Sequence, residues 1–130
     1  TPRLSSAASD VYKRQAYASG DTLEITYVEN NTDIKDLIWE KRPVLVFSNS
    51  HLDPNLKQQI KMFGSDPDAL SSRDVKVFVD DKPEPNSNLR KRFRPKGFLI
   101  ILIGKDGQIK LRKNSPWSAR ELTRIIDKGS

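Results

Sequence analysis

The sequence predicts a single α/β domain in which helices flank a central mixed sheet. Residues 98–103 are continuously apolar, a run too short to span a membrane and the right length for a strand buried on both faces. Lys105-Asp106-Gly107 then forms a tight-turn sequence, and residues 108–112 alternate polar and apolar side chains as a return strand does. Upstream, strand-like and helical patterns alternate, which favours parallel strands joined by crossover helices with an antiparallel edge added last.

The first elements expected are an edge strand and a short helix. Apolar and polar side chains alternate over residues 23–28, which suits an edge strand or an extended lead-in. Residues 34–39 place apolar side chains at i, i+3 and i+4, which predicts a short amphipathic helix with Asp33 as its cap. Pro43 then leads the chain into a buried strand at Val44–Phe47.

A longer helix and a third strand follow. Asp53 and Pro54 supply a helix cap and a proline at the first position, and apolar residues recur behind them until Gly64, the expected end of this helix. Residues 66–70 are expected to form another turn. Val75–Val79 is the third buried strand.

The remaining elements are two helices around the hairpin. Leu89 and Phe93 anchor a short helix after a polar loop at residues 80–88, and its other face is expected to carry Arg90, Lys91, Arg92 and Arg94. The last helix is expected to run from Ser115 to Ile126, with Ser115 as its cap and Pro116 at its first position.

Composition excludes several classes of chemistry. The 130 residues include no cysteine, which removes disulfides, thiolate nucleophiles and cysteine metal sites. A single histidine leaves no His cluster for zinc, and no glycine-rich phosphate loop occurs. We therefore predict no metal and no cofactor.

The first 18 residues are set apart from the domain, which we place at residues 19–130. Residues 1–15 show no periodicity and resemble a translated sequencing adapter of the kind found in environmental DNA assemblies, so we exclude them from the fold; a natural disordered terminus is the alternative. Ala16-Tyr17-Ala18 has the Ala-x-Ala form that precedes signal-peptidase cleavage, although chance alanines would look the same.

Two segments resemble thioredoxins. Residues 97–107 follow that family's order of glycine, apolar residue, cis-proline, strand and Lys-Asn-Gly turn, with Leu99 in place of the cis-proline. Asp53-Pro-Asn-Leu56 falls within a residue or two of the Cys-x-x-Cys position. The resemblance implies a thioredoxin-like fold, and the missing cysteines exclude the thiol–disulfide reaction.

A closer resemblance covers residues 37–127. The chain is similar to the P-DUDES family, a thioredoxin-like group of unknown function in bacteria whose members also occur as domains in the vertebrate extracellular proteins equarin, URB and SRPUL. The motifs that carry this resemblance are Leu37-x-Trp39, Arg42-Pro-Val-Leu-Val-Phe47, Arg73-Asp74, Leu-Ile-Gly-Lys-Asp-Gly107, Lys110-x-Arg112 and Ile-Asp127. The resemblance to this family implies a secreted or periplasmic protein. Members usually continue beyond the Ile-Asp pair, so a C-terminal truncation is also an expectation.

Charge is distributed unevenly along the chain. Residues 16–85 carry 8 basic and 13 acidic side chains, whereas residues 86–130 carry 12 basic and 3 acidic ones. We expect one exposed basic surface that binds an acidic protein or a polyanion. A solvated surface without a ligand is the alternative. The candidate binding residues are Arg92, Arg94, Lys105, Lys110 and Arg112.

Two further hypotheses remain open. The domain could be an enzyme acting on a small anionic substrate, if His51, Asp53 and Arg73 converge at the strand ends where α/β sheets bind ligands. It could also bind nucleic acid, which is disfavoured because no aromatic residues alternate with the basic ones to form a stacking platform. The binding or interaction module is the interpretation that the sequence favours.

Overall fold

A computed structural model of the chain describes residues 23–84 and 86–129, and within them the expected mixed sheet is present. Three strands are parallel neighbours, in the order β2-β4-β3, and β5 and β6 extend the sheet antiparallel beyond β3. The three predicted buried strands, β4, β3 and β5, are therefore neighbours, and β6 is the expected antiparallel return strand. The strands are β2 (Glu24–Tyr27), β3 (Arg42–Phe47), β4 (Val75–Asp80), β5 (Leu99–Ile103) and β6 (Ile109–Lys113).

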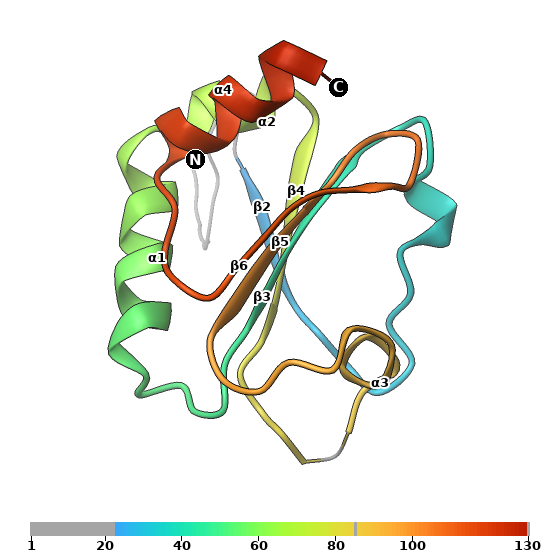
Figure 1. Cartoon of the computed structure of the whole chain (residues 1–130), viewed down its shortest axis with the longest axis vertical. Helices are drawn as coiled ribbons and strands as arrows, with labels where there is room; N and C mark the ends of the chain where they lie inside the picture. Colours follow the sequence, from blue (N-terminus) through green and yellow to red (C-terminus); the bar gives the residue numbers. More distant parts are fainter. Residues whose placement is uncertain (1–22, 85, 130) are drawn as a thin grey trace, which may run out of the picture.

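Helices cover both faces of the sheet (Figure 1). Helices α1, α2 and α4 lie on one face, and the short helix α3 and the 3-10 turn η1 lie on the other. Their bounds are η1 (Lys35–Leu37), α1 (Pro54–Ser65), α2 (Pro67–Ser71), α3 (Asn88–Phe93) and α4 (Ala119–Gly129). No helix in the described part of the chain is long and apolar enough to cross a membrane.

Each face of the sheet has its own hydrophobic core. Because side chains alternate along a strand, Ile100 and Leu102 of β5 join the core under α1 and α4, and Leu99, Ile101 and Ile103 join the core under α3. All five residues of β5 are buried, which explains the continuous apolar run in the sequence. The residues set apart at 1–18 lie outside the described part.

Local capping decides where the helices begin. The Asp53 Oδ1 atom accepts a hydrogen bond from the Asn55 amide at 2.9 Å, as expected, and Pro54 is the first residue of α1. The helix continues one residue past Gly64. Asp33 Oδ1 likewise accepts from the amides of Ile34 and Lys35, at 2.7 and 3.1 Å, but the element after it is only a 3-10 turn.

The start of the last helix was wrongly predicted. The cap is Ser118, whose Oγ accepts from the Glu121 amide at 3.1 Å while the Glu121 carboxylate accepts from the Ser118 amide at 2.9 Å. The chain stays non-helical until then because the buried Gln59 side chain holds both backbone groups of Trp117, at 2.7 and 2.8 Å. Ser115 and Pro116 therefore precede the helix.

The exposed position predicted for Arg90 was also wrong. Arg90 is only 6% exposed, and its guanidinium forms an ion pair with Asp80, which is 5% exposed. Its neighbours Lys91, Arg92 and Arg94 are exposed, as expected. A helix residue between Leu89 and Phe93 is therefore directed inward by a partner on a different element.

Candidate binding site at the carboxyl ends of the parallel strands

Ser48 and Asp80 lie side by side at the carboxyl ends of β3 and β4. Phe47 pairs with Asp80 in the parallel register, and the Ser48 amide donates to the Asp80 carbonyl at 2.8 Å. Ligands of open α/β sheets bind outside these strand ends. The polar side chains gathered here are therefore the first candidates for a functional site.

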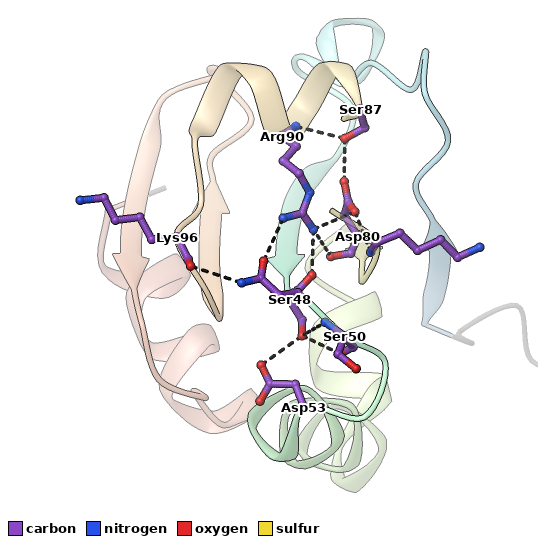
Figure 2. A network of polar contacts seen from close by, with 9 residues as sticks. Ser48, Ser50, Asp53, Asp80, Ser87, Arg90 and Lys96 are labelled. Atoms are coloured by element: carbon purple, nitrogen blue, oxygen red, sulfur yellow. Dashed lines mark hydrogen bonds and ion pairs between the residues drawn. The ribbon is translucent and has the colours of Figure 1, made fainter. Parts of the chain in front are cut away.

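Arg90 connects α3 to both strand ends (Figure 2). Ser87 caps α3 by accepting from the Arg90 amide at 3.1 Å, and this places the Arg90 side chain over the sheet edge. One guanidinium nitrogen, Nη2, donates to the Ser48 carbonyl at 2.8 Å and to the Asp80 carbonyl and Oδ1 at 3.0 Å each. The guanidinium also lies 5.7 Å from the centre of the Phe47 ring.

The Asp80 carboxylate has a hydrogen-bond donor on each oxygen. The Ser87 hydroxyl donates to Oδ2 at 2.6 Å, and the Lys82 amide and Arg90 share Oδ1. Burying a charged pair is costly unless additional hydrogen bonds satisfy its polar atoms, and the Asp80 carboxylate has such bonds whereas Arg90 Nε has none. The arrangement therefore fixes α3 relative to β3 and β4.

The loop between β3 and α1 is tied to the same edge. The Ser48 hydroxyl contacts the Ser50 carbonyl at 2.7 Å and Asp53 Oδ2 at 3.0 Å. Asp53 thus uses one oxygen for this loop and the other for the α1 cap. His51, which lies between Ser48 and Asp53 in this loop, is exposed.

A shallow hollow of about 560 Å³ opens next to this network, and we call it the cationic hollow. Arg90 Nη1 contacts Asn49 Oδ1 at 3.4 Å, and Asn49 Nδ2 contacts the Lys96 carbonyl at 3.4 Å. In Figure 2 the Lys96 ammonium points away from the network, which only its carbonyl joins. Four lining residues are basic and one is acidic. The lining residues are Asn49, Pro83, Glu84, Asn86, Arg90, Lys91, Arg94, Pro95 and Lys96.

The five basic residues that were expected to form one surface have different surroundings. Arg94 lines the cationic hollow, whereas Arg92 lines a different hollow at the other end of β3. The guanidinium carbon of Arg92 lies 4.9 Å from the centre of the Phe93 ring. Arg112 donates to the Phe93 carbonyl at 2.7 Å. Arg92 and Arg94 thus line different hollows, although Arg92 lies in α3 and Arg94 directly follows it.

The two lysines of that set have acidic partners. Lys105 Nζ lies 2.7 Å from Asp74 Oδ2, and this hydrogen bond holds the Asp74 pKa below its ordinary value. Lys110 Nζ lies 3.1 Å from Asp106 Oδ2. The Asp106 pKa is lowered first by the Gln108 amide and then by Lys110. Both lysines are thus partly neutralised.

His51, Asp53 and Arg73 are not brought together. His51 and Asp53 follow the carboxyl end of β3, whereas Arg73 precedes the amino end of β4, its parallel neighbour. Arg73 instead binds the Asp127 carboxylate through two hydrogen bonds of 2.9 and 3.0 Å, which lower the Asp127 pKa. The strands run in the same direction, so the length of the sheet separates Arg73 from the other two.

Sequence reasoning missed most of this site, namely Ser48, Asn49, Asp80, Ser87 and Arg90 of the network and Lys91 and Lys96 of the hollow. The available signal was weak. Asp80 ends an otherwise apolar strand, and Arg90 interrupts the spacing of Leu89 and Phe93, so each charge lies next to buried positions. No group of three or more His, Cys, Asp or Glu side chains within residues 23–84 and 86–129 is placed to hold a metal ion.

The architecture and the site together define a thioredoxin-like domain without cysteines. Its fold is similar to that of a mutant thioredoxin from Halobacterium salinarum, with a TM-score of 0.62 and 18% identity over 86% of this chain and 94% of that one. Chloroplastic thioredoxin z gives a TM-score of 0.57 and 18% identity, over 82% of this chain and 93% of that one. The reduced 2-Cys peroxiredoxin of Plasmodium vivax gives a TM-score of 0.60 and 14% identity, over 74% of this chain and 81% of that one. At these identities the likeness establishes the fold.

The chain belongs to the family described as "Domain of unknown function (DUF4174)", which matches residues 33–130. No curated protein matches the chain. The family assignment agrees with the expected thioredoxin-like domain of unknown function.

Proposed function

We propose that this domain is a redox-inactive binding module whose cationic hollow takes an acidic segment of a partner protein. The observation that carries the proposal is the placement of four basic residues around Asn49, on a frame fixed by the buried Arg90–Asp80 pair. Of the lining residues, Arg90 and Lys91 belong to α3, which this pair connects to the sheet. A fixed position reduces the entropy that these two side chains lose on binding. The absence of cysteine excludes thiol chemistry at this sheet edge.

Charge and shape both support an acidic peptide as the ligand. Lys91, Arg94 and Lys96 are exposed around the hollow, with Glu84 as the one acidic lining residue. The hollow is open and shallow, which suits an extended chain better than an enclosed small molecule. Asn49 and the Arg90 guanidinium also line the hollow, where they contact each other at 3.4 Å.

The test is the affinity for a fluorescein-labelled polyglutamate peptide, measured by fluorescence anisotropy. Lys91→Glu/Lys96→Glu should weaken binding at least about tenfold, because ~1.4 kcal/mol is lost when two attractive contacts become repulsive. Raising the salt from 0.1 to 1 M should also weaken it, since the Debye length falls from about 10 to about 3 Å.

The matched control is Lys57→Glu/Lys61→Glu, which changes the net charge equally on the exposed face of α1. It should reduce the affinity much less. Equal losses in the two variants would mean that only net charge matters, and the proposed site would be wrong. Heparin that binds more tightly than polyglutamate, with the same dependence on Lys91 and Lys96, would show that the ligand is an acidic polysaccharide and not an acidic protein.

We also propose that the domain is exported. The Ala16-Tyr17-Ala18 sequence and the resemblance to the P-DUDES family support this. Mass spectrometry of the natural protein should then find Ser19 as the first residue, and a mature chain that retains Ala16 would contradict cleavage there.

A further inference from the structure

One nitrogen of the Arg90 guanidinium is hardly used by the fold. Nη2 donates to three protein oxygens at 2.8–3.0 Å, whereas Nη1 has one contact in the described part of the chain, with Asn49 Oδ1 at 3.4 Å. Nε is buried and has no hydrogen-bond partner there. Nη1 carries two protons, and N–H···O bonds are normally about 2.7–3.2 Å long, so Nη1 is a weakly bonded donor on a buried cation.

Arg90 meets the cationic hollow on its Nη1 side. Nη2 is bonded to the strand ends, while Nη1 contacts Asn49, and both Arg90 and Asn49 line the hollow. Asn49 is exposed, and its second side-chain contact, from Nδ2 to the Lys96 carbonyl, is also 3.4 Å long. The Asn49 side chain can therefore leave Nη1 without breaking a short hydrogen bond.

The exposed cations around the hollow lack acidic partners. Lys91, Arg94 and Lys96 form no ion pair with any residue in the ranges 23–84 and 86–129. Glu84 is the one acidic residue of the lining. An anionic group that enters the hollow therefore meets three exposed positive charges and, behind them, the guanidinium of Arg90.

We infer that one acidic side chain of the bound peptide contacts Arg90 directly, with a carboxylate oxygen taking the place of Asn49 Oδ1 on Nη1. The inference rests on the proposed function, because it concerns the same hollow and the same acidic peptide. A carboxylate is planar like the amide that it displaces, and its charge-assisted bond to a guanidinium is about 2.7–2.9 Å long and roughly twice as strong as one to a neutral oxygen. Arg90 thus holds the frame through Nη2 and the ligand through Nη1.

Two substitutions of Asn49 should change the affinity for labelled polyglutamate in opposite directions. Asn49→Asp places a carboxylate of the protein itself at Nη1 and should weaken binding at least about tenfold, the effect of losing a hydrogen bond to a charged group. Asn49→Ala frees Nη1 without adding a charge and should tighten binding about twofold or more, because the ligand no longer displaces an amide. A residue needed only for the shape of the loop would weaken binding in both variants.

The matched control is Asn86→Asp, which makes the same chemical change at another exposed residue of the hollow lining. It leaves the contact between Asn49 and Nη1 intact and should weaken binding less than about fivefold, the effect of one exposed charge. Equal losses for Asn49→Asp and Asn86→Asp would show that only the charge of the hollow matters. That result, or any weakening by Asn49→Ala, would overturn the inference.

A measurement without peptide separates this inference from the proposed function. Asn49→Asp should raise the Tm of the free domain by about 4 °C, because the new carboxylate bonds to Nη1, and Asn86→Asp should not raise it. A Tm at or below the native value would mean that Nη1 accepts no carboxylate, and the inference would be wrong. Polyglutamate binding that depends on Lys91 and Lys96 but not on Asn49 would overturn this inference alone, whereas no binding to the native protein would overturn the proposed function as well.

Discussion

The buried Arg90–Asp80 pair gives the sharpest stability prediction. Arg90→Met removes the donors to the Ser48 carbonyl, the Asp80 carbonyl and Asp80 Oδ1, and leaves the carboxylate buried with the Ser87 hydroxyl and the Lys82 amide. Removal of one partner of a buried pair costs about 3–5 kcal/mol. We expect a loss in this range, because two remaining hydrogen bonds cannot replace the positive charge.

Urea unfolding followed by far-UV circular dichroism measures this loss. Lys91→Met is the matched control, since it removes an exposed cation from the next position of α3 and should change the free energy of unfolding by no more than about 0.5 kcal/mol. Adding Asp80→Asn to Arg90→Met should cost less than the sum of the single changes, by roughly 1–3 kcal/mol. A loss below about 1 kcal/mol for Arg90→Met would refute the assignment of this pair as the frame of the site.

Two other predictions concern pH and redox chemistry. Because Lys105 lowers the Asp74 pKa below 3.8 in the folded state, this pair stabilises the fold above that pH and its contribution is lost as the pH falls through the lowered value. Lys105→Met should therefore flatten the fall in stability between about pH 5 and 2, and an unchanged acid profile would contradict the pairing. The domain should show no activity in insulin reduction with dithiothreitol, and Asp53→Cys/Leu56→Cys should remain a poor catalyst because Leu99 begins β5 where thioredoxins have the cis-proline. Efficient turnover by that variant would show that the loop was wrongly aligned.

Local patterns were sufficient to predict the strands and the main crossover helix. The continuous apolar run at Leu99–Ile103 reflects burial on both faces, and Asp53-Pro54 specifies the start of α1 through a hydrogen bond within three residues. These signals act over short distances along the chain. They can therefore be recognised in the sequence without any knowledge of the tertiary structure.

Long-range contacts decided what the sequence left open. Ser115 and Ser118 are equally good caps by type, and the choice between them depends on Gln59, which is 58 residues from Trp117 in the chain. Arg90 is turned inward by Asp80, a partner on another element, which helical periodicity cannot reveal. The two hollows combine segments from distant parts of the chain, so the basic residues could be counted but not assigned to one surface.

The central claim is that the cationic hollow binds an acidic peptide, and ¹H–¹⁵N correlation spectroscopy tests it most directly. Titration of the labelled domain with polyglutamate should shift the amide signals of Asn49, Lys91, Arg94 and Lys96, together with the Asn49 side-chain amide. Signals of the control lysines, Lys57 and Lys61, should remain in place. Shifts spread over α1 and α4, or an unchanged spectrum at saturating peptide, would contradict the account.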